Sequence, residues 1–148
     1  MSIESHAESG AQVLTREECL SLMASMPVGR LVFTDRALPA VVPVNFVLSG
    51  RQIVLRTGST SSLAAAVRGS VVAFEVDRID PAGYRGWSVT VVGRAEHVTD
   101  PQRIAQLEQL PLLSWAGHEL EQFVVISVEL VNGRRVGLGP VAARSQAV

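Results

Sequence analysis

A run of small hydroxyl residues in the middle of the chain has the clearest chemical potential. Residues 56–67 read R-T-G-S-T-S-S-L-A-A-A-V and follow the strand-like segment Q-I-V-L. The Ala-rich second half predicts a helix over residues 61–68. Because the first N–H groups of a helix have no partner within it, they attract anions. Arg56 adds a fixed positive charge, so this stretch predicts a phosphate-binding corner.

A plainer interpretation of the same residues is a helix cap beside a surface arginine. The serines of this stretch have no base near them in the sequence, which disfavours a nucleophilic role. His6, His97 and His118 are widely separated, and Cys19 is the single cysteine, so no metal site is predicted. His118 follows Trp115 in an irregular stretch and is a further candidate for a ligand contact.

Composition limits the possible classes of protein. The chain has 148 residues, of which 47% are hydrophobic and 18% are charged, as in a single globular domain. All 13 basic residues are arginines, the net charge is −1 and no basic run occurs, which disfavours nucleic-acid binding. No apolar run reaches the ~18 residues that span a bilayer. The first ten residues also lack a secretory pattern, so we expect a cytoplasmic protein without a membrane partner.

The domain is predicted to cover residues 14–138, between a flexible arm at 1–13 and a frayed tail at 139–148. Thr15 and Glu18 form a capping-box pattern that predicts a helix over 16–25. The pair Asp100-Pro101 predicts the start of another helix, over 102–109.

Most of the remaining segments have the alternation and turn signals of strands. Strands are predicted at 29–34, 39–48, 52–56, 71–76, 86–98, 122–130 and 134–137. The short turns between the first three predict an antiparallel meander, and residues 77–85 are predicted to form a loop. The fold class is therefore mainly β (α+β), an antiparallel barrel with three short helices.

Three residues carry special meaning in these strands. Pro43 requires an edge, a bulge or a break in pairing. Gly93 suggests a bulge or bend of the kind that curls a sheet into a barrel. Asn132-Gly133 is the strongest hairpin-turn signal in the chain.

Four segments, in this order and spacing, resemble one protein family. They are V-V-P-V-N-F at 41–46, I-V-L-R-T-G-S-T-S-S-L-A-A-A-V at 53–67, V-V-A-F-E-V-D at 71–77 and G-W-S-V-T-V-V-G-R-A-E-H-V at 86–98. Together they resemble the pyridoxamine 5′-phosphate oxidase-like flavin-binding proteins, in particular a small actinobacterial branch near the nitroimidazole-resistance proteins. The resemblance covers residues 14–136. It implies a homodimeric split β-barrel that holds FMN in two grooves at the dimer interface.

The resemblance also implies roles for individual residues. One strand segment would line the isoalloxazine ring with its backbone, with an amide at the ring edge: Pro43, Val44, Asn45 and Phe46. The strand end and helix start would hold the ribityl chain and phosphate: Arg56, Thr57, Ser61, Ser62 and Leu63. The partner subunit would offer Trp87 and Ser88 to the flavin, although Trp87 fits a place in the dimer core equally well.

The chain departs from the family pattern at Ser62, where relatives commonly have a lysine that pairs with the phosphate. FMN binding would then be weaker, would depend on Arg56 and Arg68, or would be replaced by another ligand. Gly133-Arg134-Arg135 is all that remains of the oxidase's C-terminal substrate set, which argues against pyridoxamine phosphate as substrate. Three functions follow: an FMN oxidoreductase acting on an unidentified small molecule, a reductase that uses a deazaflavin cosubstrate, and a non-enzymatic flavin- or ligand-binding module.

Overall fold

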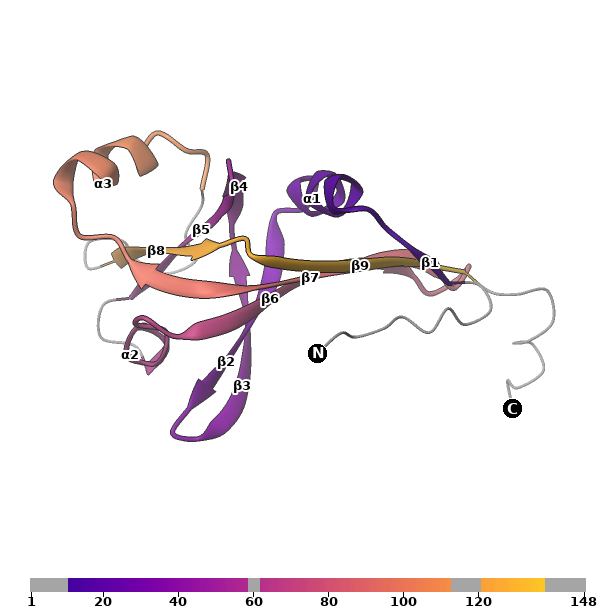
Figure 1. The fold of residues 1–148 in the computed structure, drawn as a ribbon, viewed down its shortest axis with the longest axis horizontal. Helices are drawn as coiled ribbons and strands as arrows, with labels where there is room; N and C mark the ends of the chain where they lie inside the picture. Colours follow the sequence, from indigo (N-terminus) through magenta and orange to yellow (C-terminus); the bar gives the residue numbers. More distant parts are fainter. Residues whose placement is uncertain (1–10, 59–61, 113–120, 138–148) are drawn as a thin grey trace.

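Antiparallel strands dominate the computed structural model of the chain, which describes residues 11–58, 62–112 and 121–137 (Figure 1). The helices are α1 Arg16–Ala24, α2 Ser62–Ala66 and α3 Pro101–Leu107. The strands are β1 Ala11–Val13, β2 Val28–Asp35, β3 Leu38–Asn45, β4 Val47–Ser49, β5 Gln52–Gly58, β6 Val71–Asp80, β7 Arg85–His97, β8 Glu121–Ser127 and β9 Leu130–Val136. This confirms the predicted mainly β class with three short helices.

The two end strands of the sheet are consecutive in the chain. Its strands follow the order β3-β2-β6-β7-β8-β5-β4, and the two end strands β3 and β4 are separated in sequence only by Phe46. The first three predicted strands therefore do not form a simple meander: the second bends at Phe46, and its two halves pair with β2 and β5. The result is a split β-barrel, with Pro43 on the end strand β3 as predicted.

The long strand β7 divides its length between the barrel and a sheet that extends beyond it (Figure 1). Gly86 to Val92 pair with β9, whereas Ala95 to His97 pair with β8. The change of partner occurs around Gly93, where a Cβ atom would overlap the carbonyl oxygen of Ser127. The register with β6 continues without a bulge, so this glycine allows a close backbone approach.

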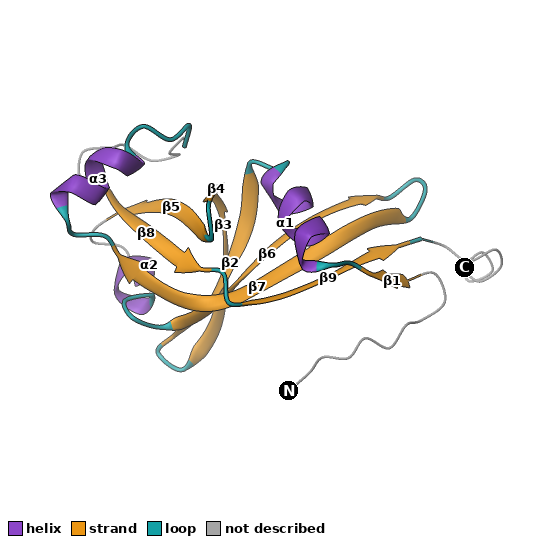
Figure 2. Ribbon diagram, turned by 45° about the horizontal axis from the view of Figure 1, so that its top comes forward, coloured by secondary structure: helices purple, strands orange, loops and turns teal. Residues whose placement is uncertain are grey.

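Helix α1 lies across one face of the extended sheet (Figure 2). The predicted capping box is confirmed: the Glu18 N–H donates to Thr15 Oγ1 at 3.1 Å, and the Thr15 N–H donates to Glu18 Oε1 at 2.8 Å. Cys19 and Met23 are buried beneath the helix. The face of this sheet that α1 covers continues into the barrel interior, and we call it the inner face. We call the opposite face the outer face.

The hairpin turn predicted at Asn132-Gly133 is wrong. Both residues lie inside β9, where Asn132 pairs with Thr90 and Gly133 pairs with Val89. A Cβ atom on Gly133 would overlap the Cys19 Sγ atom, so the glycine lets α1 approach the sheet. Long-range pairing and helix packing therefore override the local turn preference.

The hairpin between β6 and β7 is longer than predicted. Its strands pair as far as Asp80 and Arg85, so residues 81–84 form the turn in place of the loop expected at 77–85. Residues 11–13, expected in a flexible arm, pair with β9 as strand β1. The strand predicted at 122–130 ends at Ser127, and β9 begins at Leu130.

The buried residues form a main core and a smaller cluster. The main core lies on the inner face and includes Phe74, Val89 and Val91, all fully buried. The smaller cluster joins Val54 and Phe123 to α3. The side chain of Asp100 accepts a hydrogen bond from Arg103 N–H and caps α3, as predicted. No helix in the described ranges combines the length and apolar character required to cross a bilayer.

Candidate functional site

The two predicted phosphate contacts on β5 point in opposite directions. Thr57 is 5% exposed and faces the barrel interior, in line with Ile53 and Leu55. Arg56 lies on the other face, where its guanidinium carbon is 4.4 Å from the centroid of the Phe123 ring. This cation–π contact holds the charge against the smaller cluster. The corner therefore offers one outward cation, with a hydroxyl that points into the core.

Helix α2 is shorter than the predicted 61–68 and runs only from Ser62 to Ala66. Ser61 and the side chain of Ser62 lie outside the described part of the structure. Leu63 is half-buried and packs on the main core. The helix does not continue because the chain turns at Gly69, which has a positive φ of 66°.

His97 and Gln122 are two polar residues near this corner that the sequence did not indicate. His97 Nε2 lies 2.8 Å from the carbonyl oxygen of Ala64, so β7 is tied to α2. His97 Nδ1 and Gln122 Oε1 are buried without a hydrogen-bond partner among the described residues. Gln122 is opposite Thr57 across the β5–β8 ladder. Strand alternation could have indicated that His97 points inward, because it lies two residues after the inward-facing Ala95.

The predicted ring segment lies at the break between β3 and β4. Pro43 is exposed, whereas Val44 and Asn45 are half-buried. Phe46 is 3% exposed and packs edge-to-face on Phe74 with a centroid distance of 4.8 Å. The Phe46 ring is therefore part of the core, and Asn45 supplies the polar side chain of this segment.

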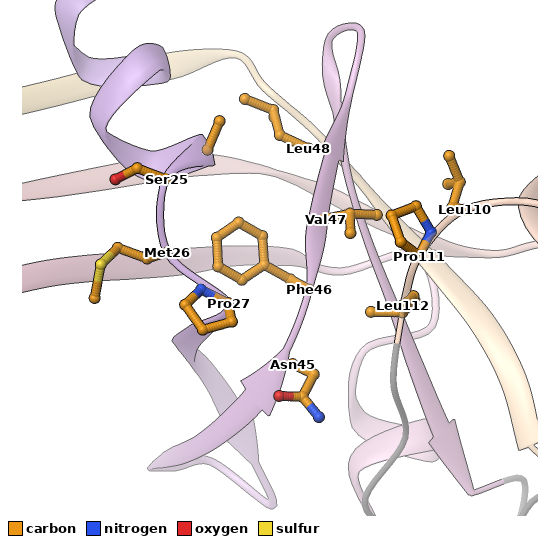
Figure 3. A pocket seen from close by; sticks show the side chains of 11 residues that line it. Ser25, Met26, Pro27, Asn45, Phe46, Val47, Leu48, Leu110, Pro111 and Leu112 are labelled. Carbon is orange, nitrogen blue, oxygen red and sulfur yellow. The ribbon is translucent and has the colours of Figure 1, made fainter.

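A pocket of about 410 Å³ opens beside this segment (Figure 3). It is lined by residues 24–27 after α1, residues 45–48 at the break, and residues 110–112 after α3. Most of these side chains are apolar, and Asn45 supplies an amide. Apolar walls with a few polar groups are typical of sites for planar small molecules.

Phe123 connects this pocket to Arg56. The ring that carries Arg56 packs in the same cluster as Val47, Leu110 and Leu112, all three of which line the pocket. Arg56 and one side of the pocket thus pack against the same hydrophobic cluster. This places the predicted ring segment and Arg56 in one region of the molecule.

The structure does not bring Trp87 and Ser88 to that region within one chain. Val98 is level with Phe123, because its N–H donates to the Phe123 carbonyl at 3.0 Å, and Phe123 is opposite Arg56. At about 3.3 Å per residue, the distance along the chain from Trp87 to Val98 is roughly 36 Å. As neighbours in a strand, Trp87 and Ser88 also point to opposite faces. Trp87 is 7% exposed in the main core.

Ser88 belongs to the outer face, which has an apolar row across five strands. The pairing register sets its five members side by side, and we call them the outer row: Val41, Val32, Ala73, Val92 and Leu130. Two of them are strongly exposed, Val41 at 57% and Leu130 at 63%. No described element covers this face.

A charged cluster lies next to the outer row. Arg30 Nη1 is 2.9 Å from Glu75 Oε1 and 3.0 Å from Asp77 Oδ2. Burial raises the pKa of the Glu75 carboxyl to about 7; a hydrogen bond with Asp77 adds to this rise, and Arg30 opposes it. The cluster therefore contains a carboxyl group that titrates near neutral pH.

Comparison with known proteins assigns the family. The model of the pyridoxamine 5′-phosphate oxidase family matches residues 15–135. The chain belongs to this family. An uncharacterized protein of Mycobacterium tuberculosis is 41% identical over 128 residues, a span that covers 83% of this chain and 84% of that protein.

Solved structures of related proteins have the same fold. An FAD-binding protein from Mycobacterium smegmatis is 32% identical, with a TM-score of 0.78, over 86% of this chain and 100% of that one. An FAD-binding protein from Mesorhizobium loti is 23% identical, with a TM-score of 0.73, over 86% of this chain and 99% of that one. At that lower identity the likeness supports the fold alone, which is the predicted split barrel.

Proposed function

We propose that this member of the pyridoxamine 5′-phosphate oxidase family is an oxidoreductase that binds FMN and acts on a small molecule. The observation that carries the proposal is that Arg56 and one side of the apolar pocket pack against the same hydrophobic cluster. FMN combines a planar, partly apolar ring with a dianionic phosphate, so it requires both features at once. The FAD-binding relative from Mycobacterium smegmatis supports a flavin as the ligand.

The residues of this region fit the parts of FMN. The pocket walls are apolar and enclose about 410 Å³, which is within the range typical of cofactor sites. Asn45 would contact the polar edge of the ring, and Arg56 would form charged hydrogen bonds with the phosphate. The flavin would supply the redox chemistry. The protein's own groups orient it, and the apolar walls exclude water from the ring.

The proposal includes a homodimer. Trp87 and Ser88 lie far along the sheet from the level of Arg56, so one chain offers each flavin only one side of a groove. The uncovered outer row is an apolar surface on which a second copy would pack. Ser88 points to this outer face and would be near such an interface. Trp87 is buried on the inner face of the same strand and would contribute to the core beneath the interface.

A direct test is flavin binding by the purified protein and by substituted proteins. The wild type should be yellow or should bind added FMN in a fluorescence titration. Arg56→Ala should weaken binding about tenfold or more, because a charged hydrogen bond contributes roughly 1.5–3 kcal/mol. The matched control Arg36→Ala removes a similar exposed charge from the β2–β3 turn. Failure of the wild type to bind FMN, or equal affinities for both variants, would refute the proposal.

One observation favours a second candidate, a deazaflavin-dependent reductase of the same fold. Ser62 stands at the position where the family resemblance implies a lysine that pairs with the phosphate. A weaker hold on the phosphate suits a cosubstrate that must leave after each turnover. Calorimetric titration with FMN and with a deazaflavin decides between the two, since the tighter ligand identifies the cofactor. Tight binding without turnover of any redox substrate would instead support a non-enzymatic binding module.

A further inference from the structure

A second pocket lies at the far end of β7 from the flavin region proposed above. It encloses about 420 Å³ at the base of the β6–β7 hairpin and reaches strand β9. Seven of the described residues line it: Arg78, Asp80, Arg85, Gly86, Trp87, Arg135 and Val136. Three of the thirteen arginines of the chain therefore converge on one pocket.

The strand register places two of these arginines on either side of the tryptophan. Arg78 pairs with Trp87 across β6 and β7, and Trp87 pairs with Arg135 across β7 and β9. Residues opposite each other in neighbouring strands point to the same face, and strands are about 4.8 Å apart. The two arginine backbones thus lie roughly 10 Å apart with the indole between them. Both flexible side chains can reach a single ligand above the indole.

The positive charges of this pocket are poorly compensated. Within residues 11–58, 62–112 and 121–137, no hydrogen bond or ion pair involves the side chains of Arg78, Arg85 or Arg135. Among the described residues, Asp80 is the single acidic residue that lines the pocket, and its Oδ1 atom accepts a hydrogen bond from the Ala82 N–H in the turn. Because the three guanidinium groups line one pocket, an anion between them would offset their mutual repulsion.

The nearest acidic residues of α1 do not close the pocket. Glu17 and Glu18 line a neighbouring hollow that shares Arg135. The pKa of Glu18 is lowered mainly by its hydrogen bonds with Thr15, and the charge of Arg135 is the smallest contribution. Arg135 thus interacts only weakly with Glu18 of α1, and it also lines the second pocket.

We propose that Arg78, Arg85 and Arg135 form a binding site for the phosphate group of a small molecule. Guanidinium groups form paired hydrogen bonds with phosphate oxygens, and three of them can neutralise a group with two or more negative charges. The edge of Trp87 forms an apolar floor beside that group. Gly86 is required here because a Cβ atom would overlap the carbonyl oxygen of Arg78, so the floor of the pocket is tightly built.

The test is calorimetric titration of inorganic pyrophosphate into the full-length protein at low ionic strength. The wild type should bind, and Arg78→Gln and Arg135→Gln should each weaken binding about tenfold or more, as expected for loss of one charged hydrogen-bonding partner. The matched control is Arg36→Gln, which removes one exposed charge from the β2–β3 turn and should change affinity less than about twofold. Circular dichroism and thermal melting verify that each exposed-site variant is folded.

A second arm separates this site from the proposed flavin site. Pyrophosphate can also bind at the corner near Arg56, so the titration is repeated with Arg56→Gln, in which the binding event that Arg78→Gln and Arg135→Gln weaken should persist. The proposal is overturned if wild-type protein fails to bind at roughly millimolar pyrophosphate. It is also overturned if Arg56→Gln abolishes binding, or if Arg36→Gln weakens it as much as Arg78→Gln does. None of these results depends on whether FMN binds, so the two proposals fail independently.

Discussion

The inner and outer faces of the extended sheet differ although the same strands build both. On the inner face, Phe74, Val89 and Val91 are fully buried by the rest of the chain, including α1. On the outer face, Val71 is 60% exposed and Leu130 is 63% exposed. The inner face is therefore completed by the chain itself, whereas the outer face combines the apolar outer row with the Arg30 cluster, and no described element covers it. This contrast teaches that strand alternation predicts two sides but not what covers each.

The largest expected effect tests the inner face. Phe74→Ala should lower the free energy of unfolding by about 3–5 kcal/mol, because it removes a fully buried ring and leaves a cavity. Urea denaturation measures this change. Val71→Ala on the outer face of the same strand should stay within about 0.5 kcal/mol of wild type. Similar losses for the two variants would erase the contrast between the faces.

The next effect tests whether a second copy covers the outer face. Val92→Arg puts a charge in the middle of the outer row and should weaken the proposed dimer about a hundredfold or more, since an unpaired charge in an apolar interface must be desolvated. Light scattering should show the mass falling to that of a monomer, with little change in secondary structure. Leu38→Arg adds the same charge at the β2–β3 turn and should leave the mass unchanged. A monomeric wild type at micromolar concentration would contradict the expectation.

A smaller effect concerns the contact between α1 and the inner face. Gly133→Ala should cost about 1–3 kcal/mol of unfolding free energy, because its Cβ atom would overlap Cys19 Sγ. Removing that sulfur relieves the overlap, so Cys19→Ala combined with Gly133→Ala should lose less stability than the two single changes added together. Chemical denaturation of the three variants measures the coupling. Simple additivity would show that the helix does not rest on this glycine.

The smallest effect is the pH dependence of the outer face. The pKa of Glu75 is raised to about 7 in the folded chain, so between its unfolded value and pH 7 the folded state holds a proton that the unfolded state has lost. Stability should then fall as the pH rises through this window. The change should remain below about 1 kcal/mol, because the side chain is partly exposed to solvent. Denaturation at pH 5 and pH 7.5 measures this change, and Glu75→Gln should not lose stability between the two. A wild type that is more stable at pH 7.5 than at pH 5 would contradict the prediction.

Local signals in the sequence predicted the local structure well. Thr15 and Glu18 are three residues apart and form the capping box that starts α1, and Asp100 caps α3. Pro43 lies on the end strand β3, because a residue without an N–H group cannot complete a central ladder. These predictions succeed because each depends on interactions within a few residues.

Predictions that depended on distant partners were less reliable. Asn132-Gly133 has the composition of a turn, but pairing with β7 and contact with Cys19 hold it in a strand. In the candidate site, the roles that the family resemblance implied for Arg56 and for residues 45–46 stay predictions. The opposite orientations of Arg56 and Thr57, and of Trp87 and Ser88, follow from strand alternation alone. The arginines of the second pocket come from three separate strands, so sequence spacing did not indicate that Arg78 and Arg85 would lie beside Arg135.

The prolines of β3 have a consequence for aggregation. An end strand with free N–H groups can recruit a strand from another molecule and so begin an ordered aggregate. A proline nitrogen in such a strand faces away from its partner, so in β3 the nitrogens of residues 39, 41, 43 and 45 point outward. Pro39 and Pro43 remove alternate donors from that series. The end of the sheet therefore offers a new strand an interrupted row of donors, and the protein should resist edge-to-edge assembly even when the barrel loosens at Phe46.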